Sequence, residues 1–407
     1  YRLFGVSEEL SFIFNNLIFG LTIFVVFLLG LLIFDNQHTG LWSAFIYVLV
    51  PQNILWFNTT AAEPSSTFWT AFAIFSVFLF MKYQKNSLLF LVACVLSFSL
   101  NFRPESILLL LIVLTAIFLF QQKLFMEYRF YVFGILIICL LIPLIGHHYA
   151  VRMENWGSFG DKFSFSYFKN NFIANASFYF KNIRFPVIYS LLALFGLLSK
   201  TKCKEISILV LWFLLFWGIF LFFYAGSYNY GVDVRFSLLS YVPFVLLSGY
   251  GLYRIQILLN KWTKNIYISF ILVAVLALSF LPFMSMLRAE TQEAWAARKD
   301  HKYAKEFAEL LPENSIILTH NPNMFLVWGK NAAQTSIANN ETTYVNNVLF
   351  QRYSGGMFFH WNYWCNVPDS LQNSFCEQIL QSYDCKLIKE KTEKQYRYAI
   401  YQLKRAK

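Results

Sequence analysis

Long apolar runs recur along the first 284 residues, and they most constrain what this chain can fold into. A run of roughly 20 apolar residues is long enough to cross a bilayer as a helix, and shorter runs can borrow flanking residues or tilt. The composition agrees, because 57% of the residues are hydrophobic and only 14% are charged, with mean hydropathy +0.49. Soluble domains are roughly 25% charged. The sequence therefore predicts an α-helical polytopic membrane protein. Ten spans are expected, at 12–34, 41–57, 68–80, 87–100, 106–120, 130–146, 186–199, 206–224, 236–252 and 266–284.

Basic residues in the short loops predict the orientation of these spans. Ten of them fall in alternate loops and are expected inside, at Lys82, Lys85, Lys123, Arg129, Lys200, Lys202, Lys204, Arg254, Lys261 and Lys264. The opposite short loops hold only Arg103 and Arg235, so the positive-inside rule places those loops outside. The net charge of +11 comes mostly from residues 1–284, with 18 Lys and Arg against 10 Asp and Glu. This excess of positive charge indicates the orientation of the spans in the membrane, and no nucleic-acid partner is expected.

The chain divides by composition into two parts. Residues 1–284 are expected to form a transmembrane domain with about ten spans and a long outer loop at 147–185. Residues 285–407 are less apolar and alternate strand-like and helix-like patterns, which predicts a small soluble α/β domain on the outer face of a cell membrane. Its three cysteines allow at most one disulfide, and Cys365–Cys376 is the predicted pair. No residue spacing resembles a metal site.

Glu63 and Arg103 are the first candidates for chemistry. Glu63 precedes Pro64 at the expected outer start of a span, where it is either an ordinary first-turn acid or an acid facing an outer cavity. Arg103 and Glu105 lie in the outer turn NFRPES, close to the hydrocarbon, where ionisable groups commonly face a partner or a water-filled cavity. Arg103 either pairs with Glu63 structurally or binds a phosphate, which guanidinium groups contact bidentately.

The segment YNYGVDVRFSLLSYVPF supplies the remaining candidates. Asp233 and Arg235 lie at the mouth of another span, with Tyr228 and Tyr230 just before them. These four residues form either an interfacial aromatic belt with a local ion pair or a second basic contact for an anionic lipid headgroup. With Arg103 and Glu105, they are the candidate substrate-binding residues, and Glu63 is the candidate catalytic residue.

The order of these features resembles the GT-C glycosyltransferases that use polyprenyl-phosphate sugars, in particular the protein O-mannosyltransferase and aminoarabinose transferase group. The resemblance rests on FLLGLLIFDNQHTGLWSAFIYVLVPQNILWFNTTAAEPSSTFW, in which a span, a short inner turn and a second span precede an acidic helix start. It extends to RPE at 103–105, to VRFSLLSYVPFVLLSGYGL, and to the tail with LPENSIILTHNP, ILQSYDCKLI and YAIYQL. The resemblance covers nearly the whole chain through order and topology, and each motif alone is degenerate.

The resemblance implies a membrane enzyme that transfers a mannose-like sugar, with inversion, to a protein, lipid or glycan acceptor on the outer face. It implies no required cofactor or metal, and a lipid-linked sugar is the donor. In this group the main catalytic acid is an Asp in the first outer loop. Residues 1–9 resemble only the end of that loop, so the Asp is expected upstream of Tyr1, and Glu8 and Glu9 come too late to replace it.

Two other functions remain open from the sequence. A transporter or flippase for lipid-linked sugars would use the same basic groove without forming a glycosidic bond. A non-catalytic membrane scaffold would need no such groove. The enzyme interpretation requires Glu63, Arg103 and Arg235 to converge in space.

Overall fold

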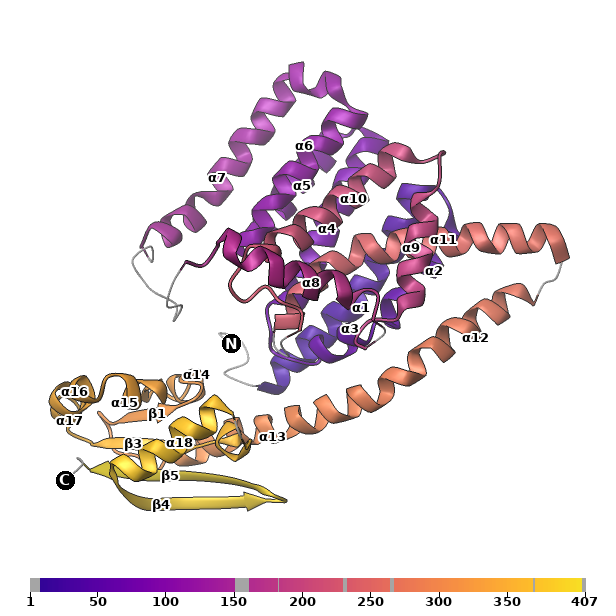
Figure 1. Ribbon diagram of the computed structural model, residues 1–407. Helices are drawn as coiled ribbons and strands as arrows, with labels where there is room; N and C mark the ends of the chain where they lie inside the picture. Colours follow the sequence, from indigo (N-terminus) through magenta and orange to yellow (C-terminus); the bar gives the residue numbers. More distant parts are fainter. Residues whose placement is uncertain are drawn as a thin grey trace. The chain divides into compact units, whose positions relative to one another are not determined.

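The computed structural model in Figure 1 describes residues 8–150, 161–181, 183–229, 233–263, 267–368 and 370–404. The chain separates into two compact units, a helical unit that ends at Leu287 and a C-terminal unit that begins at Arg288. This division lies close to the boundary after residue 284 that the composition predicts.

The helical unit consists of α-helices joined by short turns and 3₁₀ segments (Figure 1). Its α-helices are α1 (Glu8–Phe34), α2 (Gln37–Val48), α3 (Pro51–Trp56), α4 (Glu63–Tyr83), α5 (Asn86–Leu100), α6 (Leu108–Phe120), α7 (Tyr128–Ala150), α8 (Phe168–Phe178), α9 (Val187–Leu197), α10 (Cys203–Gly218), α11 (Leu238–Thr263) and α12 (Ile268–Phe280). Its 3₁₀ segments are η1 (Pro104–Ile107), η2 (Gln122–Met126), η3 (Phe165–Tyr167), η4 (Ile219–Leu221), η5 (Asp233–Ser237) and η6 (Leu281–Phe283).

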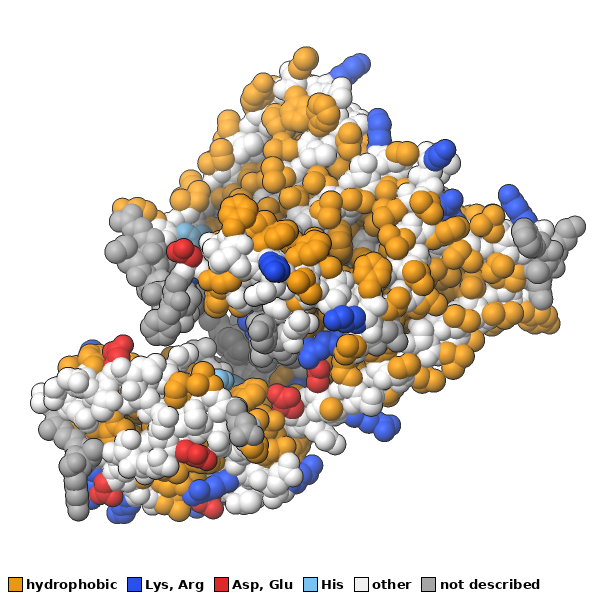
Figure 2. Space-filling model, in the orientation of Figure 1, with side chains coloured by type: hydrophobic (Ala, Val, Ile, Leu, Met, Phe, Trp, Pro, Cys, Tyr) orange, Lys and Arg blue, Asp and Glu red, His pale blue; other side chains and the backbone are white. Residues whose placement is uncertain are grey.

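Six of the ten predicted spans lie in helices that are long and apolar enough to cross a membrane, among the described residues. Those helical stretches are Leu10–Phe34, Glu63–Tyr83, Tyr128–Ala150, Cys203–Leu221, Val234–Lys261 and Ile268–Ala308. Three further apolar helices are shorter, at Asn86–Leu100, Pro104–Phe120 and Val187–Leu197. Figure 2 shows the visible face of the helical unit as mostly hydrophobic, as a lipid-facing surface is. The helical unit therefore has the build of a polytopic membrane domain.

The predicted span 41–57 is wrong as a single helix. Its residues form α2 and α3, which meet at Val50 and Pro51. Pro51 has no backbone N–H and opens α3, while Val50 adopts an extended conformation with ψ 115°. A residue before proline disfavours the helical conformation, so the chain breaks there.

The two ends of the helical bundle separate the predicted inner loops from the predicted outer turns. At one end, Lys82 lies 3.6 Å from Asp35, and Lys204 donates to the Leu119 carbonyl. Figure 2 shows several Lys and Arg side chains at the upper end of this unit. The segments around Glu63, Arg103 and Arg235 come together elsewhere, at the start of α4, the start of η1 and within η5. The sidedness of these loops in a membrane stays a prediction.

Two glycines allow α9 and α11 to pack at close range. A Cβ at Gly251 would collide with the carbonyl oxygen of Leu192, and one at Gly196 would collide with that of Leu247. Small residues of this kind let helix backbones approach within membranes.

We expect Gly251→Ala to lower the free energy of unfolding by about 1–3 kcal/mol, since overpacking forces backbone shifts. Thermal unfolding in detergent measures this loss, with Gly20→Ala as the control because a Cβ at Gly20 meets nothing within 4 Å. Equal melting of the two variants would contradict the close packing.

The C-terminal unit is built on a five-stranded sheet of order β2-β1-β3-β5-β4. Its strands are β1 (Ile316–Thr319), β2 (Asn331–Gln334), β3 (Met357–Trp361), β4 (Asp384–Glu393) and β5 (Tyr396–Lys404). The helices beside them are α13 (Met284–Ala308, which begins before the division), α14 (Asn323–Leu326), α15 (Ser336–Asn340), α16 (Thr342–Tyr344), α17 (Phe350–Arg352) and α18 (Leu371–Ser382), with a π-helical turn η7 (Val345–Leu349) and a 3₁₀ segment η8 (Tyr363–Asn366). Strands β1, β2 and β3 run parallel, and β5 runs antiparallel to β3 and β4. The predicted α/β character is therefore confirmed.

Both faces of this sheet are covered. Ile317 and Phe358 face a core with Phe307 of α13, whereas Leu318 and Phe359 face a second core with Ile379 of α18. Strands β1 and β3 consequently consist almost entirely of buried residues, as strands buried on both faces do, whereas β4 is mostly exposed. The second core contains the Cys365–Cys376 disulfide, so the predicted pair is present.

His360 in β3 makes this unit sensitive to acid. Its side chain is fully buried, and its Nδ1 lies 3.0 Å from the Thr319 hydroxyl oxygen. Burial, with a smaller effect of His301, lowers the pKa of His360 from 6.5 to about 3. The His360 side chain therefore binds a proton near pH 6.5 in the unfolded chain, whereas in the folded unit it stays neutral until about pH 3. The free energy of unfolding consequently falls as the pH drops from about 6.5 towards 3.

We expect the C-terminal unit to lose about 2 kcal/mol of stability between about pH 7.5 and pH 5, since each pH unit below 6.5 costs about 1.4 kcal/mol. Hydrogen exchange of the β1 and β3 amides in the full chain, corrected for intrinsic rates, measures this loss. The His360→Gln variant serves as the control, because it removes the titrating group and should lose less over the same range. Equal acid sensitivity of the two proteins would exclude His360 as the cause.

Candidate functional site: a buried ion-pair cluster

Four charged side chains from three separate segments meet in the helical unit. The Glu63 carboxylate accepts a hydrogen bond from Arg103 Nη1, and Arg235 Nε lies 2.8 Å from the same oxygen, Oε1. Arg103 Nε forms a further ion pair with Glu105. The side chains of Glu63 and Glu105 are only 5% and 9% exposed, that of Arg103 is 16% exposed, and that of Arg235 is 33% exposed. We call these four residues the ion-pair cluster, and it carries no net formal charge.

Local sequence explains why each side chain stands where it does. Glu63 and Pro64 open α4, because proline is favoured in the first turn and an acid there complements the helix dipole. Arg103 is extended (φ −151°, ψ 140°) because Pro104 follows it, and Pro104 then begins η1. Arg235 lies in η5, the short turn that leads into α11. Each charged residue therefore sits at a helix start.

Phe236 supports both arginines. The guanidinium carbon of Arg103 lies 5.0 Å from the centre of its ring, and that of Arg235 lies 5.1 Å from it. Phe236 is itself buried, and its ring stacks on Phe220 at 4.8 Å. A cation over an aromatic face gains roughly 0.5–2 kcal/mol, more when it is desolvated. The aromatic ring thus holds two like charges side by side next to the shared carboxylate.

Buried polar atoms without a described partner occur on the elements around this cluster. They belong to α3, α4, α5 and η1, where burial of an unpaired polar group costs about 1–3 kcal/mol. The atoms are Gln52 Nε2, Asn53 Oδ1, Ser66 Oγ, Thr70 Oγ1, Ser97 Oγ and Ser106 Oγ. Helix α3 contacts η5, α4 contacts α5, and α5 contacts η1, so these elements form one neighbourhood. Unpaired buried groups in such number indicate a place that water or a polar ligand satisfies.

The cluster can bind an anion. Arg235 contacts Glu63 through Nε, and its two Nη groups meet no acceptor among the described residues. Arg103 uses Nη1 and Nε, so its Nη2 is likewise without a described acceptor. Guanidinium N–H groups can donate parallel hydrogen bonds to the oxygens of an oxyanion.

The structure brings together four of the seven candidate residues. Glu63, Arg103, Glu105 and Arg235 converge, which is the condition the enzyme interpretation requires. Glu105 forms an ion pair with Arg103, and its role in substrate binding stays a prediction.

Of the three other candidates, one makes no described contact with the ion-pair cluster, and the side chains of two lie outside the described residues. Tyr228 is buried, its backbone N–H donates to Asn175, and its ring lies 5.4 Å from that of Phe178. Tyr230 and the side chain of Asp233 lie outside the described residues.

Two features of the site were not among the candidates predicted from the sequence. Phe236 follows Arg235 directly, and an aromatic residue beside an arginine in a buried turn was the available signal. Gln52 and Asn53 interrupt an otherwise apolar run after Pro51, and buried amides in such a run signal a polar cavity. Among the described residues, no group of three or more His, Cys, Asp or Glu side chains is arranged to hold a metal ion.

Comparison of the sequence with protein-family models and with curated proteins gives no match. The fold and the cluster define the class at a coarse level: a helical protein with helices long and apolar enough to cross a membrane, a buried ion-pair cluster and a small C-terminal α/β unit. Function therefore rests on the chemistry of the chain's own residues.

Proposed function

We propose that this protein is a membrane glycosyltransferase of the GT-C type. It transfers a mannose-like sugar from a polyprenyl-phosphate donor to a protein, lipid or glycan acceptor on the outer face, with inversion at the anomeric carbon. The observation that carries the proposal is the convergence of Arg103 and Arg235 on the buried Glu63 carboxylate. The sequence resemblance to polyprenyl-phosphate-dependent enzymes includes the segments that hold these three residues and points to the same ligand.

The two arginines bind the donor phosphate. In the reaction the bond between the anomeric carbon and the phosphate oxygen breaks, and the acceptor hydroxyl oxygen bonds to that carbon. The phosphodiester carries one negative charge, and the departing phosphate monoester carries about −1.5 to −2 at pH 7. Arg103 and Arg235 stabilise the charge that develops on the leaving phosphate, which is the kind of interaction that lowers a barrier.

Glu63 acts here as a positioning residue. One of its carboxylate oxygens holds both guanidinium groups, and their remaining N–H groups stay available for phosphate. Holding two cations in place before the donor binds reduces the cost of arranging them during the reaction. The resemblance implies that the general base, which takes the acceptor proton, is an Asp in the first outer loop of such enzymes.

The polyprenyl chain is accommodated by apolar surface on the helices. The exposed side chains of α6 include Leu111 and Phe118, and those of α7 include Ile138 and Ile142. Surfaces of this kind face lipid, so a long isoprenoid can lie along them while its phosphate reaches the ion-pair cluster. Membrane lipids are the surrounding partners in this proposal.

Transfer of radiolabelled sugar tests this function. Membranes containing the full-length protein are incubated with labelled polyprenyl-phosphate mannose and acceptor, in parallel with Glu63→Gln, Arg103→Ala and Arg235→Ala variants. The control is Arg129→Ala, because Arg129 forms a similar ion pair with Glu127 away from the cluster. Labelled product in wild type and control, but not in the three variants, supports the enzyme. Labelled lipid that crosses the bilayer without any product would identify a transporter.

A further inference from the structure

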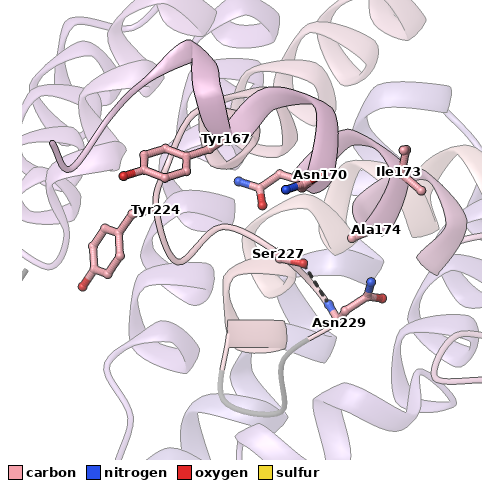
Figure 3. Close-up of a pocket in the computed structure, with 8 residues that line it drawn as sticks. Tyr167, Asn170, Ile173, Ala174, Tyr224, Ser227 and Asn229 are labelled. Atoms are coloured by element: carbon pink, nitrogen blue, oxygen red, sulfur yellow. Dashed lines mark hydrogen bonds between the residues drawn. The ribbon is translucent and has the colours of Figure 1, made fainter. Parts of the chain in front are cut away.

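A second site lies on α8 and the turn that follows η4. It is a cavity of about 370 Å³, at the small end of the roughly 300–1,000 Å³ typical of ligand pockets. Figure 3 shows Tyr167 and Tyr224 at the left of the pocket, with Ile173 and Ala174 at the right and Asn170 between the two sides. Ser227 and Asn229 lie below. We call it the amide pocket. Its polar lining residues are Tyr167, Asn170, Asn171, Tyr224, Ser227 and Asn229.

The chemistry of this lining selects neutral, hydroxyl-rich ligands. Among the residues that the structure describes, none that lines the pocket carries a charge, so this lining favours neither an anion nor a cation. The side chains of Asn170, Tyr224 and Asn229 donate or accept no hydrogen bond with a described residue. Amides and phenols both donate and accept, as sugar hydroxyls require, and tyrosine adds an apolar ring face.

The pocket is built on a tightly held frame. Asn171 Nδ2 donates to the Phe220 and Phe223 carbonyls, at 3.1 and 2.8 Å. Asn175 donates to the Gly226 carbonyl at 2.9 Å, and its Oδ1 accepts from Tyr228 N at 2.8 Å. These buried amides tie α8 to the chain between η4 and η5. The lining is therefore positioned before a ligand arrives, which lowers the cost of binding.

Aromatic rings connect the frame of the amide pocket to the ion-pair cluster. Phe220 and Phe223, whose carbonyls Asn171 binds, pack against Phe236 with ring centres 4.8 and 5.8 Å apart. Phe236 in turn supports the guanidinium groups of Arg103 and Arg235. The frame of the amide pocket is thus linked to the arginines of the ion-pair cluster through Phe220, Phe223 and Phe236.

We propose that the amide pocket binds a sugar unit of a glycan acceptor. That the bound sugar belongs to the acceptor of the transfer reaction rests on the proposed function. That the pocket binds a sugar at all rests only on the chemistry of the pocket. A peptide acceptor is less favoured, because the pocket offers side-chain amides and hydroxyls around a compact cavity instead of an open strand edge. The short cavity fits the terminal part of a glycan.

Ligand-observed NMR with the purified full chain in nanodiscs tests the proposal. The probe is mannotriose, with a Ser/Thr-rich peptide of similar size for comparison. We expect saturation transfer to mannotriose in wild type and at least a tenfold weaker Kd in Asn170→Ala and Tyr224→Ala. Lys169→Ala is the matched control, because Lys169 is an exposed neighbour of Asn170 that does not line the pocket. Thermal unfolding checks that all variants are folded.

The outcomes separate this inference from the proposed function. Mannotriose binding that needs Asn170 and survives Arg103→Ala supports the pocket, even if no sugar transfer is ever detected. Binding of the peptide through the same residues, no binding of mannotriose by wild type, or equal binding by wild type and Asn170→Ala would each overturn it.

Discussion

Replacing Arg103 or Arg235 by alanine is expected to lower the rate of sugar transfer about 100-fold or more. Each change removes a cationic group that stabilises the charge on the leaving phosphate, and loss of one such donor typically costs about 10²–10³ in kcat. The fall should appear in kcat more than in donor KM, because the phosphate gains charge as the bond breaks. The measurement is a steady-state transfer assay over a range of donor concentrations.

Lysine at the same positions distinguishes charge from geometry. Arg103→Lys keeps the charge but loses the planar fork that contacts Glu63, Glu105 and phosphate together. We expect partial activity, about tenfold below wild type, since the charge remains and the bidentate contact is lost. The control Arg129→Ala should keep the wild-type rate. An unchanged rate in Arg103→Ala, with normal expression, would remove the cluster from the reaction.

Replacing Glu63 by glutamine is expected to destabilise the helical unit by about 3–5 kcal/mol, as breaking a buried ion pair does. The Glu63 side chain is 5% exposed and holds two guanidinium groups, so its removal leaves two neighbouring cations with only Glu105 to balance them. Thermal unfolding of the purified protein in detergent measures the loss. Glu127→Gln is the control, because Glu127 is 38% exposed and surface pairs contribute only about 0–1 kcal/mol.

A double variant tests whether charge balance is the cause. Glu63→Gln combined with Arg235→Gln restores neutrality around Arg103, so we expect it to melt above Glu63→Gln alone. Separate additive losses in the two variants would show that the side chains do not interact. Wild-type melting in Glu63→Gln would contradict the buried cluster itself, regardless of function.

The convergence of the cluster was predictable because loop charges predict topology. Counting Lys and Arg in the short loops places the turns that hold Glu63, Arg103 and Arg235 on one side, and each turn adjoins a helix start. Oppositely charged groups at the same depth in a membrane tend to pair. Which of them pair was open, and the structure selects Glu63 as the shared partner.

Other parts of the site depend on packing that a single sequence does not reveal. The role of Phe236 depends on Arg103 reaching it from a distant turn, and the amide pocket depends on Asn171 binding carbonyls some fifty residues away. The helix break at Pro51 had a local signal, but apolar residues on both sides made the segment look like one span. In the C-terminal unit, by contrast, the odd number of cysteines limited the choices, and the predicted pair is the one present.

The most direct measurement is a cryo-electron microscopy structure of the full-length protein in nanodiscs with undecaprenyl phosphate. This lipid carries the phosphate of the donor without the sugar. The account predicts phosphate density in contact with the guanidinium groups of both Arg103 and Arg235, beside Phe236. Lipid phosphate bound elsewhere, with the Arg103–Glu63 and Arg235–Glu63 pairs undisturbed and no density between them, would contradict it.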